Sequence, residues 1–265
     1  MANHIGVIGA GVMGEALIAA LIRSGINPAD ISFAEKREER AAELTARYSI
    51  VHKDIASVAA SAQTILLVVK PQDMQATLSD LSANIAPDSL VISFAAGKTI
   101  ASIAGGLNSS NPIIRVMPNT PALIGKGASG YSLGEGVTDA QKSFIKEFLN
   151  ATGKAIEVPE LLQDAVTATS GSGPAYFFAF VEAMVDGAVA LGLSREDATT
   201  LTIQTIVGAS AMLAESGDTP TTLREKVTSP NGTTAAALAS FNQSGLHAIV
   251  ADAMAAAARR SQELA

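Results

Sequence analysis

Glycines stand at positions 9, 11 and 14, between an apolar run at residues 5–8 and a segment with helical spacing at residues 15–24. A strand that turns through glycines into a helix offers the free N–H groups of the helix start to a pyrophosphate. A lone Gly-x-Gly-x-x-Gly also occurs in ordinary turns, but here a strand precedes it and a helix follows it. The loop therefore predicts a dinucleotide site.

Charges of both signs follow the second predicted strand, residues 29–34. Glu35 suits the free ribose hydroxyls of NAD, whereas Lys36 and Arg37 suit the 2′-phosphate of NADP. Arg40 fits the solvated first turn of the next helix as well as it fits a cofactor contact. The sequence predicts a ribose site here and leaves the choice between NADPH and NADH open.

Candidate cofactor contacts also follow three later strands. Lys70 comes directly after a continuous apolar run, at the strand end where open α/β sheets bind ligands. Residues 95–97 (Ala-Ala-Gly) are small enough for a flat ring to approach closely. Asn119 lies in a proline-rigid loop, where its amide either contacts cofactor or substrate or caps its own turn.

Small hydroxylated residues and a glycine precede a predicted helix near the C-terminal end, in residues 227–234 (VTSPNGTT). Such a helix start presents unpaired N–H groups and hydroxyls to one point, which suits a carboxylate. The structural alternative is an N-cap by Ser229 or Thr233 with a tight turn at Asn231 and Gly232. We favour the anion site.

Strands alternate with helices over residues 1–159, which predicts an N-terminal Rossmann domain with a doubly wound, mainly parallel sheet. Strands are predicted at 5–8, 29–34, 64–69, 89–94, 112–117, 128–133 and 154–158, with helices at 15–24, 35–48, 56–62, 74–85 and 138–152.

Residues 160–265 show no strand pattern and predict an all-α C-terminal domain. Helices are predicted near 160–169, 174–191, 194–215, 219–227, 233–243 and 246–263. The apolar stripe on residues 175–191 is broad, and we interpret it as a subunit interface.

Composition narrows the classes of partner. The 265 residues are 48% hydrophobic with a formal net charge of −7, which disfavours nucleic-acid and anionic-membrane surfaces. The chain has no cysteine and three scattered histidines, so neither a thiolate nucleophile nor a metal site is expected. A signal peptide is not predicted, and a cytoplasmic location is expected.

Six motifs in order resemble pyrroline-5-carboxylate reductase. They are GAG at 9–11, VKPQ at 69–72, AAG at 95–97, MPNTP at 117–121, SGSGPAY at 170–176 and TSPNGTT at 228–234. The resemblance implies NAD(P)H-dependent reduction of 1-pyrroline-5-carboxylate to L-proline, the last step of proline biosynthesis. It also implies that the helical domain interlocks with a second subunit, giving a homo-oligomer built from intertwined dimers.

Carried over residue by residue, the resemblance implies cofactor contacts at Ile8, Gly9, Ala10, Gly11, Val12, Met13, Glu35, Val68, Val69, Lys70, Pro71, Ala95, Ala96, Gly97 and Glu160, to which the residue patterns add Lys36, Arg37 and Asn119. It implies substrate contacts at Ser229, Gly232, Thr233 and Thr234, to which the turn pattern adds Asn231. Two positions depart from the family: Glu35 replaces a small hydroxylated or amide residue, and Ile55 replaces an Asn on the adenosine side.

Hydride transfer to a C=N bond needs positioning and a proton for the nitrogen, but no nucleophile. We expect the N–H groups of residues 232–234 to hold the substrate carboxylate and the Thr234 hydroxyl to assist protonation, unless Thr234 is only a helix cap.

Two alternatives to the function of a pyrroline-5-carboxylate reductase remain. A β-hydroxyacid dehydrogenase needs a lysine on the helix after the SGSG run, yet the sole lysine beyond residue 154 is Lys226. The second alternative, a nucleotide-sensing dimer, would give residues 227–234 no function.

Overall fold

The computed structural model describes residues 4–264. The described chain forms two compact units, one made of the residues up to Pro174 together with those from Ala256 onward, the other of Ala175–Ala255. Each is described separately below. The sequence predicts a boundary between the Rossmann domain and the helical domain after residue 159, and this boundary stays a prediction.

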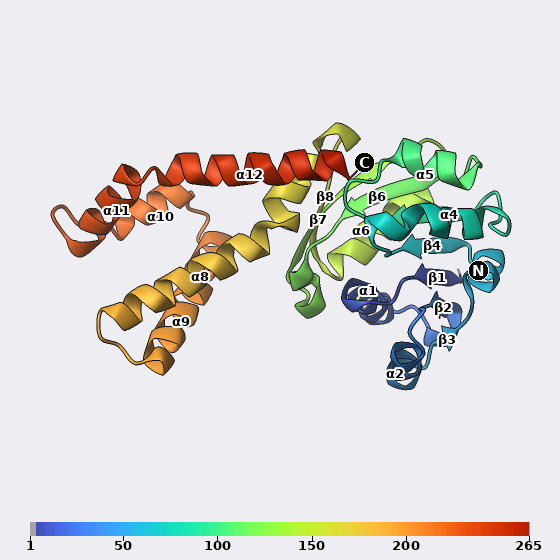
Figure 1. Ribbon diagram of the computed structural model, residues 1–265, viewed down its shortest axis with the longest axis horizontal. Coiled ribbons are helices and arrows are strands. Elements are labelled where there is room, and N and C mark those ends of the chain that lie inside the picture. The colour runs from blue at the N-terminus through green and yellow to red at the C-terminus, as the bar shows by residue number, and fades with distance from the viewer. Residues whose placement is uncertain (1–3, 265) are drawn as a thin grey trace. The chain divides into compact units, whose positions relative to one another are not determined.

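The first unit is built on an eight-stranded sheet in the order β3-β2-β1-β4-β5-β6-β7-β8, drawn in blue to green in Figure 1. The strands are β1 (Ile5–Ile8), β2 (Ile31–Ala34), β3 (Val51–His52), β4 (Thr64–Leu67), β5 (Leu90–Ser93), β6 (Ile113–Met117), β7 (Gly127–Leu133) and β8 (Gly153–Glu157). β7 is antiparallel to β6 and parallel to β8, and the other pairs are parallel. The prediction of a doubly wound, mainly parallel sheet is confirmed.

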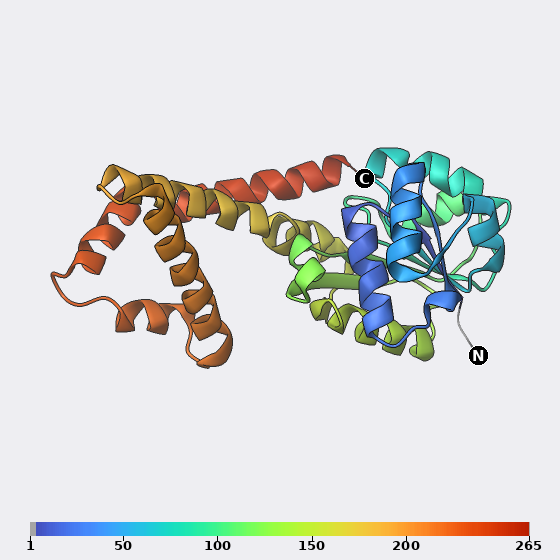
Figure 2. The same ribbon diagram turned by 90° about the horizontal axis from the view of Figure 1, so that it is seen from below.

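Helices cover both faces of this sheet, as Figures 1 and 2 show from two directions. They are α1 (Val12–Arg23), α2 (Glu38–Tyr48), α3 (Ile55–Ser61), α4 (Met74–Ser82), α5 (Ile100–Leu107) and α6 (Asp139–Asn150). One buried cluster joins one face of the sheet to α1, α2 and α6, and a second joins the other face to α3, α4 and α5. Neighbouring residues of one strand supply opposite cores, so the central strands β1, β4 and β5 are buried along their whole length.

Three parts of the first unit differ from the prediction. The expected strand at 29–34 begins only at Ile31, because Pro28–Asp30 form a 3-10 turn in which Asn27 accepts a hydrogen bond from the Ala29 N–H. β3 and α5 lie where no element was predicted. The helix expected at 160–169 is divided into a 3-10 turn (Glu160–Leu162), a single turn α7 (Gln163–Val166) and a π turn (Thr167–Gly171).

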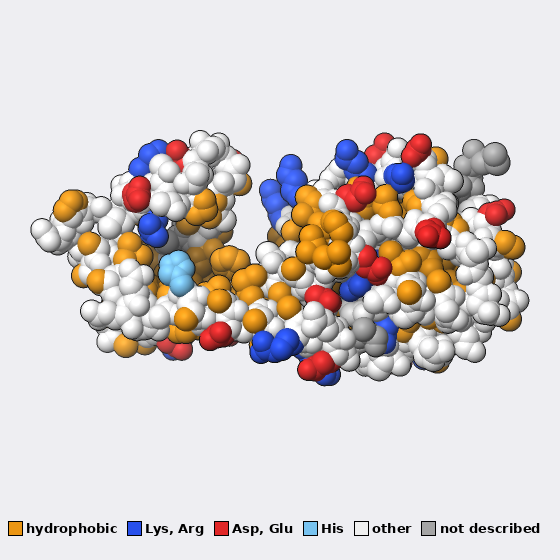
Figure 3. All heavy atoms as spheres, turned by 90° about the horizontal axis from the view of Figure 1, so that it is seen from above, with side chains coloured by type: hydrophobic (Ala, Val, Ile, Leu, Met, Phe, Trp, Pro, Cys, Tyr) orange, Lys and Arg blue, Asp and Glu red, His pale blue; other side chains and the backbone are white. Residues whose placement is uncertain are grey.

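The second unit is helical, as predicted. It contains most of α8 (Gly173–Ala190), then α9 (Arg195–Glu215), α10 (Pro220–Lys226), α11 (Thr233–Gln243) and the first part of α12 (Leu246–Glu263). Among its described residues only Val185, Ala198 and Thr202 are buried. Large apolar side chains face outward instead, with Phe177 67% and Leu191 90% exposed, and hydrophobic atoms spread over the helical unit in Figure 3. A free unit of this kind lacks a core of its own, which indicates a covering partner.

No helix within residues 4–264 has the length and apolar character needed to cross a membrane. The same described residues hold no cluster of acidic or histidine side chains suited to a metal ion.

Candidate dinucleotide and substrate sites

Two glycines of the motif that joins β1 to α1, Gly9 and Gly14, are required for steric reasons. Gly9 has φ +91°, donates its N–H to the Ala34 carbonyl at 2.9 Å, and has no space for a Cβ, which would lie 2.7 Å from the Val68 carbonyl oxygen. A Cβ on Gly14 would lie 2.2 Å from the Gly9 oxygen, so α1 could not start so close to the loop. Gly11 is the N-cap of α1 and supplies no side-chain cap, which leaves the first N–H groups of the helix for a ligand.

A cleft of about 1230 Å³ lies at the carboxyl ends of β1, β2 and β4, beside this loop. Its lining includes half of the predicted cofactor contacts: Ile8, Gly9, Gly11, Glu35, Lys36, Arg37, Val68, Val69 and Lys70. The other predicted contacts are not part of that lining: Ala10, Val12, Met13, Pro71, Ala95, Ala96, Gly97, Asn119 and Glu160. The cleft thus gathers the residues predicted for the pyrophosphate and adenosine half of a dinucleotide.

Glu35 is one of three consecutive charged residues, with Lys36 and Arg37, that line the cleft. Its side chain is 9% exposed, and Oε1 accepts hydrogen bonds from the backbone N–H and from Nε of Arg37, both at 3.1 Å. Burial alone would raise the pKa of Glu35, but the hydrogen bonds and charge of Arg37 outweigh it and hold the pKa below its usual value. Glu35 is therefore an anion at neutral pH, with its other oxygen free of Arg37.

Several lining residues were not predicted as cofactor contacts. Those in and after β3 escaped prediction because this strand is only two residues long and exposed, and the others lie at the end of β2, at the start of α2 and along residues 72–84. They are Ala34, Glu38, His52, Lys53, Asp54, Ala56, Gln72, Asp73, Thr77, Ser79, Asp80, Ala83 and Asn84. Asp54 caps α3 by accepting from the Ser57 N–H at 2.7 Å and the Ser57 hydroxyl at 2.9 Å, and these bonds lower its pKa. Ile55, already noted as a departure, lines the cleft and presents an apolar side chain where an amide would offer a hydrogen bond.

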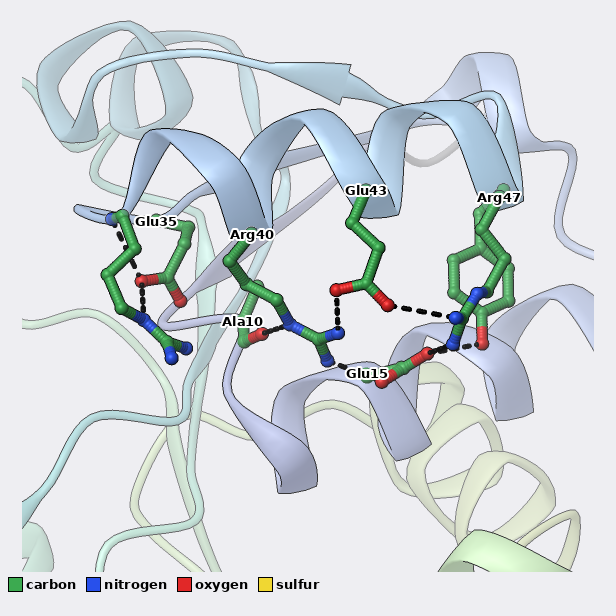
Figure 4. A network of polar contacts seen from close by, with 8 residues as sticks. Ala10, Glu15, Glu35, Arg40, Glu43 and Arg47 are labelled. Atoms are coloured by element: carbon green, nitrogen blue, oxygen red, sulfur yellow. Dashed lines mark hydrogen bonds and ion pairs between the residues drawn. The ribbon is translucent and has the colours of Figure 1, made fainter.

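Arg40 is neither a solvated residue nor part of the cleft wall. Its side chain is 15% exposed and donates to the Ala10 carbonyl at 3.3 Å, to Glu15 on α1 and to Glu43 at 2.6 Å (Figure 4). Glu15 also accepts from Arg47 and from the Tyr48 hydroxyl. Burial would raise the pKa of Glu15, but these donors lower it overall. Of the two interpretations left open for Arg40, the solvated first turn is wrong, because Arg40 packs from α2 against Ala10 and α1.

Gly97, the last of the small residues at 95–97, is closely approached by protein, which the sequence did not predict. Gly97 is buried with φ +76°, and a Cβ there would lie 2.6 Å from Leu264 Cβ and 2.7 Å from the Ser261 carbonyl oxygen. The close approach that needs glycine is therefore that of the C-terminal end of α12, which belongs to the same unit. A cofactor contact at Ala95, Ala96 or Gly97 stays a prediction.

Asn119 and Glu160 bond to distant segments of the protein, which the sequence did not predict. The Asn119 amide donates to the Ser170 carbonyl at 3.1 Å and accepts from the Ala128 N–H at 2.8 Å, so its bonds fit neither of the two predicted roles. Glu160 accepts from the Ile100 N–H at the start of α5 at 2.7 Å and pairs with buried Arg115 at 3.4 Å. Direct contact of either side chain with the cofactor stays a prediction.

Residues 229–234 form the predicted turn before α11. The Gly232 N–H donates to the Ser229 carbonyl at 3.0 Å, and Asn231 adopts φ +58°. Gly232 is the N-cap and brings no side-chain cap, so the alternative of a cap by Ser229 or Thr233 is wrong. The first N–H groups of α11 therefore lack a side-chain acceptor, with Thr233 and Thr234 in the first helical turn.

Comparison with known proteins identifies the family. Residues 160–264 match the family model described as pyrroline-5-carboxylate reductase dimerisation, and residues 4–97 match that of NADP oxidoreductase, coenzyme F420-dependent. The pyrroline-5-carboxylate reductase of Pseudomonas aeruginosa is 44% identical over 264 residues, which cover 99% of this chain and 97% of the relative. That of Methanosarcina acetivorans is 40% identical, with 99% and 98% covered. The chain belongs to the pyrroline-5-carboxylate reductase family.

Solved structures agree with this assignment. The pyrroline-5-carboxylate reductase of Coxiella burnetii superposes with a TM-score of 0.92 at 33% identity and covers 100% of this chain and 99% of its own. The Plasmodium falciparum pyrroline carboxylate reductase, solved with NADP bound, gives a TM-score of 0.89 at 29% identity, with 100% and 99% covered. The predicted fold class, a Rossmann domain followed by an all-helical dimerisation domain, is confirmed.

Proposed function

We propose that this chain is a pyrroline-5-carboxylate reductase that uses NAD(P)H to reduce 1-pyrroline-5-carboxylate to L-proline. The observation that carries the proposal is identity of 44% along nearly the whole length of a pyrroline-5-carboxylate reductase, joined to a glycine loop that opens onto a cleft. In the reaction, a hydride adds to the imine carbon of the C=N bond, and the nitrogen takes up a proton. The products are the cyclic amine and the oxidised cofactor.

The bound cofactor supplies the hydride from C4 of its nicotinamide ring. The pyrophosphate of this cofactor binds the backbone N–H groups that follow Gly9 and begin α1. Glu35, Lys36 and Arg37 face the adenosine ribose from the cleft wall. Lys70 contributes positive charge at the end of β4, where an anionic cofactor would pass.

The substrate carboxylate is assigned to the start of α11. The N–H groups of residues 232–234 have no side-chain cap, and the helix dipole favours an anion at this end. Ser229 and Asn231 shape the turn that leads into the helix. The Thr234 hydroxyl contacts the ring nitrogen and assists its protonation. These assignments rest on the motif and on the missing cap.

A second copy of the chain is the proposed partner for the exposed apolar helices. The described residues of Ala175–Ala255 bury only three side chains, while Phe177, Phe178 and Leu191 are largely exposed. Burying such residues against an identical subunit would stabilise both, and the dimerisation model covers this region. We propose an intertwined dimer as the building block of a homo-oligomer, working in the cytoplasm.

The decisive assay mixes the purified chain with the cyclic imine and either NADPH or NADH and follows the loss of reduced-nicotinamide absorbance. Oxidation that requires the imine supports the proposal. Oxidation of NADH only with keto acids would favour the β-hydroxyacid dehydrogenase alternative. Cofactor binding without turnover on any pyrroline substrate would refute the proposed activity and favour a nucleotide sensor.

A further inference from the structure

We propose that Arg40 is a positioning residue for the cofactor, because it fixes the peptide of the glycine loop that presents an N–H group to the pyrophosphate. This inference rests on the proposed function only in that the loop binds a dinucleotide. Arg40 is not part of the cleft lining and acts through Ala10.

The geometry of one peptide bond carries the first step. Arg40 Nε donates to the carbonyl oxygen of Ala10 at 3.3 Å. In a trans peptide the C=O and N–H point in opposite directions, and the partner N–H of this peptide belongs to Gly11. Holding the Ala10 carbonyl toward α2 therefore turns the Gly11 N–H away from α2. Gly11 lines the cleft, and a Cβ there would meet nothing within 4 Å, so its surroundings are open to a ligand.

The glycines explain why the loop needs such a constraint. Gly9 permits the positive φ that the loop requires, but Gly9 and Gly11 also have the largest choice of other conformations. Gly9 is held by its N–H bond to Ala34 on β2. Two peptides further along the chain, the peptide between Ala10 and Gly11 is held by Arg40. The motif supplies a loop that can adopt the binding conformation, and Arg40 restricts it to that conformation.

The guanidinium is itself fixed, so it can act as a rigid support. Glu15 and Glu43 each accept from one of its terminal nitrogens, and Glu15 is held in turn by Arg47 and Tyr48 (Figure 4). Arg40 and Glu15 side chains are 15% and 16% exposed, which limits screening by solvent. A planar group with several donors can serve a carbonyl and two carboxylates at once, which a lysine cannot reproduce.

The test compares Arg40→Gln with Arg47→Gln in the full-length protein. Both variants remove one positive charge and the pairs with Glu15 and Glu43, but only the first removes the contact with Ala10. NADH and NADPH binding is measured by fluorescence titration, with kcat and KM for each cofactor and thermal unfolding in parallel. We expect Arg40→Gln to raise the cofactor Kd and KM about tenfold with kcat within about twofold, and Arg47→Gln to change Kd less than threefold.

A second variant separates positioning from charge. Glu15→Gln removes a negative charge near the proposed pyrophosphate site, so a pure charge effect would tighten cofactor binding. Loss of the anchor of Arg40 would instead weaken it, and we expect Kd to rise about threefold, intermediate between the other variants.

Three results would overturn the proposal: equal Kd values for Arg40→Gln and wild type, equal losses for Arg40→Gln and Arg47→Gln, or tighter binding by Glu15→Gln. Binding of neither cofactor by folded wild type would overturn the proposed function as well, whereas normal binding without turnover would refute only the activity.

Discussion

Replacing Glu35 by Ser should move cofactor selectivity toward NADPH. The Glu35 carboxylate is 9% exposed on the cleft wall, and its lowered pKa keeps it charged at neutral pH. A 2′-phosphate on the adenosine ribose would add negative charge beside it. Ribose hydroxyls, by contrast, can donate to the carboxylate. The substitution removes the repulsion and the acceptor together, and it releases Arg37 from its 3.1 Å pair.

Two contributions set the magnitude. Like charges about 4 Å apart repel by about 4 kcal/mol at an effective dielectric constant of about 20 near a surface. Arg37 lies within hydrogen-bond distance of the carboxylate and cancels much of this repulsion, so we expect about 1.4 kcal/mol, or about tenfold, to remain. A lost hydrogen bond from ribose to a charged acceptor costs NADH about 1.5–3 kcal/mol more. The NADPH-to-NADH ratio of kcat/KM should therefore rise roughly 10²-fold or more.

Initial rates with each cofactor at saturating imine measure that ratio for wild type, Glu35→Ser and the isosteric Glu35→Gln. Glu39→Gln is the matched control, because Glu39 is exposed on α2, four positions after Glu35, and does not line the cleft. The control should keep the wild-type ratio. A ratio within twofold of wild type in both Glu35 variants would refute the placement of the ribose beside this carboxylate.

Three further outcomes are expected. Thr234→Ala should lower kcat roughly 10²-fold in the imine assay, and an unchanged kcat would remove its role in protonation. The pKa of Glu15 is lowered in the folded state, so its ion pairs stabilise the fold above the unfolded pKa near 4.5 and lose this effect as the pH falls below that value. In urea unfolding from about pH 6 to about pH 3, the free energy of unfolding should therefore decline less steeply with falling pH for Glu15→Gln than for wild type. Light scattering should show a dimer or larger, and a stable monomer would contradict the proposed interface.

Much of the fold could be predicted because the central strands are buried on both faces. Continuous apolar runs such as residues 64–69 are typical of that environment, and β4 lies there. The helix predicted at residues 138–152 is confirmed as α6, and the structure shows that Thr138 and Gln141 form a complete capping box at its start. By contrast, β3 has two exposed residues and pairs only along the edge of β2, which leaves no pattern to detect.

The site was less predictable wherever a side chain acts on a distant segment. Arg40 contacts a carbonyl 30 positions earlier in the chain, and Glu160 contacts an N–H 60 positions earlier. Neither spacing has a helical or strand period that would reveal it. Glu35 could be found because its place at the end of a strand is a local property. The turn before α11 was equally local, and only its cap differed from the alternative considered.

The glycine motif and the polar contacts of Arg40 with Ala10, Glu15 and Glu43 affect the same loop in different ways. The motif determines which backbone conformations are sterically allowed. At position 9, for example, a Cβ would lie only 2.7 Å from the Val68 carbonyl oxygen, so the loop conformation requires glycine there. It does not make the free loop adopt one of them, because glycines lose more conformational freedom on ordering than other residues. Where the network holds the Ala10 carbonyl before the cofactor arrives, part of that entropy cost falls on folding instead of binding. Cofactor affinity in this fold should therefore depend on α2 as well as on the loop itself.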